Sequence, residues 1–319
     1  MSHRQKLIVI LGPNASGKSA LAVALARQFN GEIISADSRQ VYRGMNIGTG
    51  KITKKEMQGI PHYLLDIASP KKRFTVAQYK KLALAAIKKI RQKNKIPIIC
   101  GGTGFYIQAV ADDLAIPEVK PDFKLRAQLE KKTTRELFNE LRKLDSNRAK
   151  TIDSKNPRRL IRALEIVLKT GKPVPPLKSP LTPPKGGEQK FPPFREGWGG
   201  FDTFFLGVKK SPEELKKLIH KRLQKRLRQG MIKEVKNLRA SGLSWKRLDG
   251  FGLEYRWISK FLQKKISYQE MMARLQKDIE HYAKRQMTWF KKDKRIRWVK
   301  NKNQADRIVK KFVRLSSRA

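Results

Sequence analysis

The segment of this sequence that most clearly implies chemistry is residues 12–19, which read GPNASGKS and match the phosphate-binding pattern G-x-x-x-x-G-K-[ST]. An apolar run at 7–11 precedes it and a helical pattern at 19–27 follows it, so it lies between a strand and a helix. Backbone N–H groups and the positive helix end would hold a diphosphate there, with Lys18 on its outer phosphate and Ser19 on Mg²⁺. A chance glycine-rich turn is the alternative, and the flanking strand and helix argue against it. The candidate diphosphate-binding residues are Gly12, Pro13, Asn14, Ala15, Ser16, Gly17, Lys18 and Ser19.

Two further apolar runs end in segments that should meet the phosphate loop. Residues 32–35 are followed by Asp37, and residues 96–100 are followed by GGTGFY, which contains Thr103. Because parallel strands end at the same edge of a sheet, we expect Asp37 to face the bound diphosphate and Thr103 to point into the same crevice. The single cysteine, Cys100, ends an apolar run and is interpreted as a packing residue.

The order of strand and helix patterns predicts an α/β fold with an inserted helical lobe. Strands and helices alternate over 6–110, which predicts a parallel sheet with helices on both faces. The inserted segment carries helix patterns only, at 123–132, 134–144, 147–151 and 157–169, with Gly171 as a stop. Later patterns predict a strand at 204–208 and helices at 212–227 and 268–290. The predicted organisation is a core at 1–121 and 203–300, a helical lobe at 122–172, a Pro/Gly-rich linker at 173–202 and a basic tail at 301–319.

The charge of the chain indicates a polyanionic partner. The 73 Lys and Arg residues outnumber 27 Asp and Glu, giving a formal charge of +46, and 34 basic against 10 acidic residues lie at 203–319. Ordinary solvated helix faces are the alternative for any single lysine run. The aromatic residues among these charges could either pack in a core or stack on unpaired bases; they are Trp245, Trp257, Trp289, Trp298 and Tyr255.

Several classes of protein are disfavoured by composition. No apolar run approaches membrane-spanning length, and the N-terminus leads directly into a strand pattern, so we expect a cytoplasmic protein without membrane association. One cysteine excludes an internal disulfide, and four scattered histidines offer no zinc-finger spacing. We expect a monomer with no obligate protein partner.

Seven segments, taken together, carry a family resemblance. They are GPNASGKS at 12–19, SADSRQVYRGMNIGT at 35–49, PHYLLDI at 61–67, FTVAQY at 74–79, GGTGFY at 101–106, RRLIRALE at 158–165 and YAKRQMTWF at 282–290. Over most of residues 5–300 the chain resembles the bacterial tRNA dimethylallyltransferases. Three local departures concern RNA contacts rather than the reaction: Asn14 replaces the usual Thr, GLEYR stands at 252–256, and His281 precedes Tyr282.

The resemblance implies a P-loop NTPase-like parallel sheet flanked by helices, with an all-helical insertion. It implies transfer of the dimethylallyl group from dimethylallyl diphosphate to N6 of the adenosine adjacent to the anticodon, with release of diphosphate. Arg222 would neutralise the leaving diphosphate, Asp37 would take the proton of the amine, and Thr103 would orient the diphosphate or the amine. The adenine would be flipped into the site while basic residues hold the anticodon stem-loop. The implied tRNA-binding residues are Asp37, Ser38, Arg39, Gln40, Thr103, Arg126, Arg158, Arg159, Arg162, Gly252, Tyr255, Lys284 and Arg285.

Three alternatives stay open at this point. The phosphate loop alone would favour a kinase of a small metabolite that uses ATP, with Asp37 as base toward a hydroxyl. A non-catalytic RNA-binding protein would use the loop only structurally, although such a protein needs no carboxylate beside phosphates. An adenylate isopentenyltransferase would use a free nucleotide as acceptor, whereas the inserted lobe and the basic tail favour tRNA.

Overall fold

The computed structural model describes residues 5–117, 119–175 and 201–315, which form two compact units. One unit comprises Met1–Asp113 and Pro183–Ala319, and the other comprises Leu114–Thr182. The predicted insertion of a helical lobe is confirmed, although the lobe extends beyond the predicted bounds of 122 and 172. The predicted linker at 173–202 lies mostly outside the described residues.

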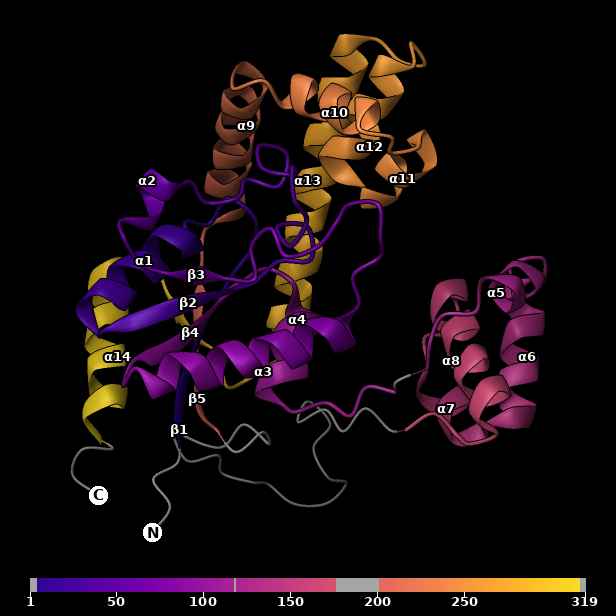
Figure 1. The fold of residues 1–319 in the computed structure, drawn as a ribbon, viewed down its shortest axis with the longest axis horizontal. Helices are drawn as coiled ribbons and strands as arrows, with labels where there is room; N and C mark the ends of the chain where they lie inside the picture. The colour runs from indigo at the N-terminus through magenta and orange to yellow at the C-terminus, as the bar shows by residue number, and fades with distance from the viewer. Residues whose placement is uncertain (1–4, 118, 176–200, 316–319) are drawn as a thin grey trace. The chain divides into compact units, whose positions relative to one another are not determined.

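The larger unit is built on one six-stranded sheet whose paired strands are all parallel, in the order β3-β2-β4-β1-β5-β6 (Figure 1). The strands are β1 (Gln5–Leu11), β2 (Gly31–Ala36), β3 (His62–Tyr63), β4 (Ile96–Gly101), β5 (Phe201–Val208) and β6 (Arg297–Val299). Residues 7–11 of the central strand β1 are buried, because helices cover both faces of the sheet. The strands predicted at 7–11, 32–35, 96–100 and 204–208 are confirmed, whereas the two short edge strands were missed.

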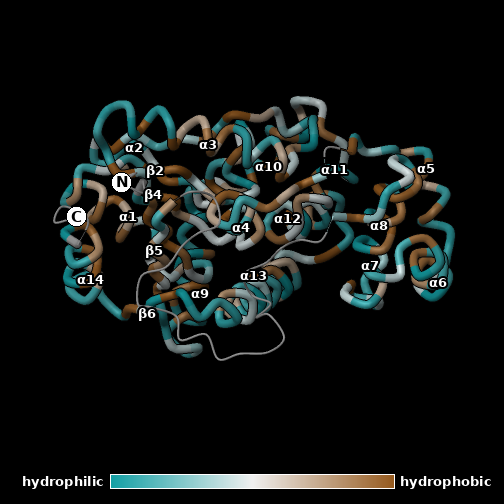
Figure 2. The backbone as a smooth tube through the Cα atoms, turned by 90° about the horizontal axis from the view of Figure 1, so that it is seen from below, coloured by the Kyte–Doolittle hydropathy of each residue, from teal (hydrophilic) through white to brown (hydrophobic). Residues whose placement is uncertain are grey.

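Helices cover the two faces of this sheet (Figure 1). On one face, α3 (Val76–Gln92) and α4 (Gly104–Ala111) share a core with the strands. On the other face lie α1 (Lys18–Gln28) and α14 (Lys302–Leu315). Because α14 buries Ala305, Val309 and Phe312, the prediction of a separate basic tail at 301–319 is wrong: its apolar positions belong to the core. Figure 2 shows the difference in pattern, with β4 mostly hydrophobic and α14 alternating between hydrophobic and hydrophilic residues.

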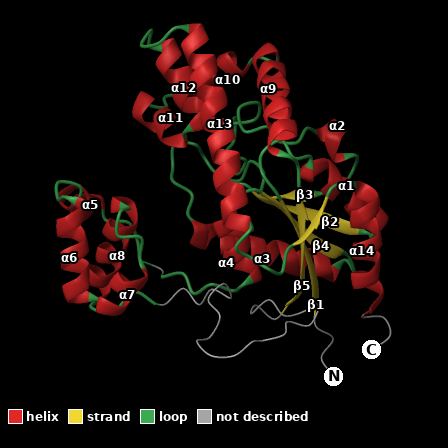
Figure 3. Cartoon of the chain, turned by 180° about the vertical axis from the view of Figure 1, so that it is seen from behind, coloured by secondary structure: helices red, strands yellow, loops and turns green. Residues whose placement is uncertain are grey.

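A cluster of helices follows β5 in the chain and has its own core (Figure 3). Its members are α9 (Pro212–Arg228), α10 (Met231–Ala240), α11 (Trp245–Phe251), α12 (Leu253–Leu262) and α13 (Tyr268–Phe290), and a short helix α2 (Lys54–Met57) lies elsewhere in the same unit. The long helix α13 packs in this core through Leu275 and Ile279 and in the sheet core through Phe290. Met271 and the polar Gln286 of α13 are also buried.

The smaller unit is an all-helical bundle. It consists of α5 (Phe123–Leu129), α6 (Thr134–Leu144), α7 (Ser146–Thr151) and α8 (Pro157–Thr170) around a core of leucines and other aliphatic residues. Asn156 caps α8 just before Pro157, and Gly171 ends the helix in the left-handed conformation that glycine favours. None of the helices in the described residues of either unit has the length and apolar composition needed to cross a membrane.

Candidate active site

The phosphate loop joins β1 to α1 at the carboxyl edge of the sheet. Gly17 caps α1 with a φ of 87°, a conformation that a side chain would disfavour. Lys18 Nζ lies 3.3 Å from the carbonyl oxygen of Pro13, so the lysine folds back over the loop. Burial lowers the pKa of the Lys18 ammonium, and the nearby Arg222 lowers it further against the opposing effect of Asp37. The site therefore concentrates positive charge that an anion would stabilise.

Asp37 follows β2 and is held by backbone N–H groups two and three residues further along the chain. Its Oδ1 accepts hydrogen bonds from the N–H groups of Arg39 at 2.8 Å and Gln40 at 3.3 Å. This arrangement is an Asx-type turn, in which a carboxylate closes its own loop. The turn fixes Asp37 in the wall of the pocket that also contains Lys18.

Thr103 lies behind this wall rather than in it. Its Oγ1 accepts a hydrogen bond from the N–H of Ser38 at 3.1 Å, and its own N–H donates to the carbonyl oxygen of Ala36 at 3.1 Å. The turn after β4 is thus tied to the end of β2 on either side of Asp37. The prediction that Thr103 points into the same crevice is wrong: Thr103 contacts the residue after Asp37 but does not line the pocket, where Cys100 and Gly101 stand instead.

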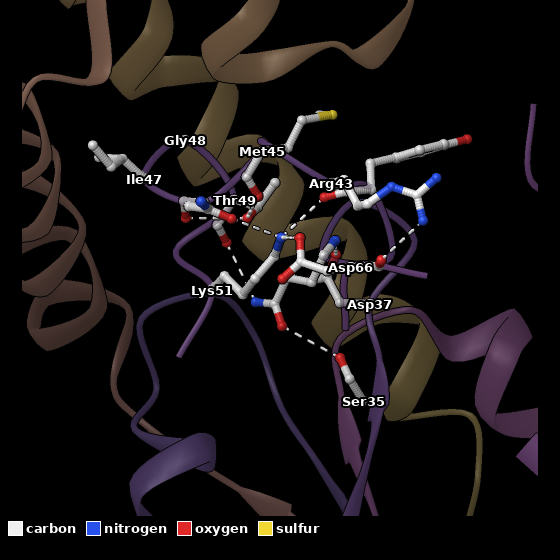
Figure 4. Close-up of polar contacts among 12 residues, drawn as sticks. Ser35, Asp37, Arg43, Met45, Ile47, Gly48, Thr49, Lys51 and Asp66 are labelled. Carbon is white, nitrogen blue, oxygen red and sulfur yellow. Dashed lines mark hydrogen bonds and ion pairs between the residues drawn. The ribbon is translucent and has the colours of Figure 1, made fainter. Parts of the chain in front are cut away.

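The opposite wall comes from the segment at 40–51, whose polar contacts hold it in a compact fold (Figure 4). The side-chain amide of Gln40 donates to the carbonyl oxygens of Thr49 and Gly50 at 3.4 and 3.3 Å. Lys51 Nζ forms an ion pair with Asp66 at 2.5 Å and donates to Asn46 Oδ1 at 2.8 Å. Thr49 and Gly50 both line the pocket, so these contacts shape it directly.

Two arginines of α9 stand at this wall in different roles. Arg222 lines the pocket, and burial together with the neighbouring Arg226 lowers the pKa of its guanidinium to about 10, which leaves it charged at neutral pH. Arg226 is buried and forms an ion pair with Glu254 at 3.1 Å. Of these two arginines, Arg222 is therefore the one available to an anion in the pocket.

The pocket enclosed by these elements has a volume of about 440 Å³. Its polar side combines Lys18, Asp37 and Arg222, and its apolar side includes Val23 and Ile52. A ligand with an anionic end and a short hydrocarbon end matches both kinds of wall. Within the described residues, no cluster of three or more His, Cys, Asp or Glu side chains could hold a metal by itself.

Comparison with known proteins identifies the family. Residues 40–293 match the family described as IPP transferase. The chain belongs to this family. Among curated relatives, the tRNA dimethylallyltransferase of Pelotomaculum thermopropionicum is 38% identical over 308 residues, covering 96% of this chain and 94% of the relative. That of Carboxydothermus hydrogenoformans is 38% identical over 314 residues, covering 97% and 96%.

Solved structures of family members have the same fold. The full-length tRNA isopentenylpyrophosphate transferase of Bacillus halodurans aligns with a TM-score of 0.69 and 31% identity, covering 98% of this chain and 96% of that one. A eukaryotic dimethylallyltransferase acting on tRNA aligns with a TM-score of 0.73 and 26% identity, covering 95% and 76%. The family and the P-loop NTPase-like fold predicted from the sequence are thereby confirmed.

Within this IPP transferase chain, some residues predicted to bind tRNA have other tasks. Tyr255 is 2% exposed, and its OH donates to Glu234 at 2.8 Å, so the prediction that it contacts RNA is wrong: its ring belongs to the helical core. Gly252 has a φ of 76° and forms the junction between α11 and α12. It provides a turn that glycine favours.

The four arginines of the smaller unit that were predicted to bind tRNA divide into two pairs. Arg126 of α5 and Arg162 of α8 both bind the buried carboxylate of Glu165 on α8, at 2.6 and 2.5 Å. These ion pairs therefore join α5 to α8. Arg158 and Arg159 are exposed on the first turn of α8. Only the second pair has the exposure expected of phosphate-binding residues.

The remaining predicted residues lie near the pocket or on α13. Ser38, Arg39 and Gln40 are half-buried, and the Arg39 guanidinium stacks on Phe251 at 5.6 Å. Lys284 and Arg285 are exposed on α13, as predicted.

Several residues that shape the site were missed from the sequence. Glu56 and Gln58 come from the unpredicted region around α2 and line the pocket. Gln286 of α13 contacts the phosphate loop, and Glu234 of α10 holds the segment at 46–48. Only Gln286 carried a sequence signal, because it is a polar residue at helical spacing from Ala283 and Phe290 on the apolar stripe.

Proposed function

We propose that this member of the IPP transferase family transfers a dimethylallyl group from dimethylallyl diphosphate to N6 of the adenosine adjacent to the anticodon in tRNA, releasing diphosphate. The observation that carries the proposal is the presence of Lys18, Arg222 and Asp37 in one pocket of a chain that belongs to this family. The curated relatives bear the name tRNA dimethylallyltransferase, which supports the same activity.

The first requirement of the reaction is stabilisation of the leaving group. The bond between the allylic carbon and the diphosphate oxygen breaks, and its electron pair stays on the diphosphate. The backbone N–H groups of the phosphate loop, Lys18 and Arg222 offset the charge that develops there. These groups are in place before the reaction, so little reorganisation is needed.

The second requirement is removal of a proton from the acceptor. The N6 amine forms a bond to the allylic carbon, and its proton passes to the carboxylate of Asp37. Hydrogen bonds from the N–H groups of Arg39 and Gln40 hold that carboxylate at the pocket wall. Thr103 contributes by orienting the Ser38 backbone beside Asp37.

The pocket also suits Mg²⁺ together with a diphosphate. Mg²⁺ is usually held by one or two protein oxygens plus phosphate oxygens and water. Ser19 lines the pocket, and its hydroxyl would hold the metal together with phosphate oxygens and water. When bound, Mg²⁺ would neutralise part of the charge on the diphosphate.

The acceptor is a base within tRNA, so it must leave its stack to reach an enclosed site. The formal charge of +46 provides attraction for the RNA backbone, and the exposed candidates for phosphate contact are Arg158, Arg159, Lys284 and Arg285. We place the protein in the cytoplasm, where its tRNA substrate is found. We propose that it acts there as a monomer. The kinase alternative rests on the phosphate loop alone, and the family comparisons do not support it.

Transfer of radiolabel from dimethylallyl diphosphate to unmodified tRNA, with Mg²⁺ and without ATP, tests the proposal. The parent protein should label the adenosine adjacent to the anticodon. Asp37→Asn should lower kcat about 10²- to 10⁴-fold, because the amide cannot accept the proton. Asp113→Asn is the matched control, since Asp113 is exposed and pairs with Lys80 outside the pocket. Phosphorylation of a small acceptor from ATP, without label on tRNA, would instead support the kinase.

A further inference from the structure

Gln286 of α13 connects two loops of the pocket that are far apart in the sequence. Its Oε1 accepts a hydrogen bond from the N–H of Asn14 in the phosphate loop at 2.9 Å. Its Nε2 donates to the carbonyl oxygen of Gly102, next to Thr103, at 2.9 Å. The side chain is buried, with 6% exposure, so both contacts are shielded from water.

Helix α13 packs closely on the turn at 101–104. A β-carbon added at Gly102 would lie 2.3 Å from Nε2 of Gln286, and one added at Gly104 would lie 2.3 Å from Nε1 of Trp289. Gln286 and Trp289 are one helical turn apart, so the same face of α13 rests on both glycines. The turn that carries Thr103 is therefore seated directly on this helix.

The amide of a glutamine side chain matches these two partners. The N–H of Asn14 requires an acceptor and the carbonyl oxygen of Gly102 requires a donor, and an amide offers both. The rest of this face of α13 is apolar, with Ala283 and Phe290 buried on either side. A buried polar group in such surroundings is stable only when it is hydrogen-bonded, and both partners are backbone groups whose positions define the pocket.

We infer that Gln286 is a positioning residue that fixes the phosphate loop, which holds the donor, relative to the turn beside the base Asp37. The inference deepens the proposed function and rests on it. The N–H of Asn14 is engaged by Gln286, so the diphosphate is left to the other N–H groups of the loop. The turn that contains Thr103 also holds the backbone of Ser38, the neighbour of Asp37. A shift of one loop against the other would separate the allylic carbon from the amine, and misplacement by about 1 Å can cost on the order of 10²-fold in rate.

Two variants of Gln286 and one matched control test this inference. Gln286→Met keeps the length of the side chain and removes both hydrogen bonds, so kcat should fall about 10- to 100-fold. The dissociation constant for inorganic pyrophosphate should rise at least about 5-fold, because the phosphate loop loses its anchor. Gln276→Met is the control, since Gln276 lies on the same helix and bonds to His220 and Glu280 instead. It should change both quantities less than about twofold.

Gln286→Glu provides a readout that a role in packing alone would not move. A protonated glutamic acid can accept from the Asn14 N–H and donate to the Gly102 carbonyl, whereas its carboxylate can only accept. The ratio of kcat for this variant to kcat for the parent should therefore rise as pH falls from 8 to 6. Taking the ratio removes the pH effects that both proteins share.

The outcomes separate this inference from the proposed function. A parent protein that transfers label, with both Gln286 variants within twofold of it at every pH, would overturn the inference and leave the function standing. A parent that transfers nothing would overturn the function, and an unchanged pyrophosphate affinity in Gln286→Met would then overturn the inference as well. If Gln286→Met does not fold, the inference is contradicted when the ratio of kcat for Gln286→Glu to kcat for the parent does not change with pH.

Discussion

Gly50 is packed so closely against Arg226 that a β-carbon added at Gly50 would lie 1.5 Å from Nη2 of the arginine. The same atom would lie 2.1 Å from Nη2 of Arg222, which lines the pocket. Arg226 cannot move aside easily, because it is paired with Glu254 and donates to the carbonyl oxygen of Gly48 at 3.2 Å. The absence of a side chain at Gly50 therefore leaves room for the arginine that lines the pocket.

Gly50→Ala should displace Arg222 and lower kcat/KM for dimethylallyl diphosphate at least about 10-fold, since a charged hydrogen bond to the leaving group is weakened. Steady-state transfer assays with varied donor concentration measure this. Gly59→Ala is the matched control, because Gly59 also has positive φ, at 78°, but nothing lies within 4 Å of its added β-carbon. Both variants carry a backbone strain of roughly 1–2 kcal/mol. Equal kinetic losses in the two would show that backbone strain, not displacement of Arg222, is responsible.

Glu234 should stabilise the segment that forms the pocket wall. Its carboxylate accepts the consecutive N–H groups of Asn46, Ile47 and Gly48 at 2.8, 2.6 and 3.0 Å. Glu234→Gln places an amide NH₂ against these donors, so the free energy of unfolding should fall by about 1–3 kcal/mol. The KM for dimethylallyl diphosphate should rise, because Thr49 and Gly50 continue from this segment into the pocket.

Chemical denaturation and donor-varied kinetics measure the two effects of Glu234→Gln. Glu213→Gln serves as the control, since Glu213 is exposed in the first turn of α9. Glu213→Gln should lower the free energy of unfolding by no more than about 1 kcal/mol. An unchanged KM for Glu234→Gln would mean that the wall keeps its shape without this anchor.

The parts of the site that could be predicted share one physical origin. The phosphate loop, Asp37 and the Thr103 turn all follow buried parallel strands, and such strands end at one edge of the sheet. Local sequence is therefore enough to bring them together. The helical lobe was predicted for a similar reason, because its periodicity and caps are local.

The parts that could not be predicted depend on contacts between distant residues. Gln286 reaches Asn14 across 272 positions, and Glu234 reaches Asn46 across 188. Tyr255 was misinterpreted because an aromatic residue among basic ones has the same sequence appearance in a core as on an RNA-binding face. For Arg162 a local signal did exist, since Glu165 follows it by three positions on the same helix.

The two pairs of arginines in the smaller unit should behave differently. Neutralising the exposed pair, Arg158→Gln with Arg159→Gln, should leave the unfolding free energy within about 0.5 kcal/mol of the parent. It should weaken tRNA binding and reduce the slope of log affinity against log salt by up to about 2, because each phosphate contact contributes roughly one. Arg126→Gln should instead lower stability by about 1–3 kcal/mol, since it leaves the buried Glu165 short of a partner. Filter binding at several salt concentrations, with thermal unfolding, distinguishes the pairs, and an unchanged salt slope would exclude Arg158 and Arg159 from the RNA contact.

The lowered pKa of Lys18 predicts a specific pH dependence of diphosphate binding. Burial disfavours the charged ammonium in the free protein, so Lys18 loses its proton at a lower pH than the usual 10.5. The affinity for inorganic pyrophosphate should therefore decline as pH rises, beginning below 10.5. Titration calorimetry from pH 7.5 to 9.5 measures this while the pKa of Arg222, about 10, keeps that residue mostly charged. Lys18→Arg is the control, because its guanidinium stays charged in this range and its affinity should vary less with pH, even if weaker throughout. A parent protein whose affinity is constant over the range, or declines in parallel with Lys18→Arg, would show that Lys18 does not supply the titrating charge.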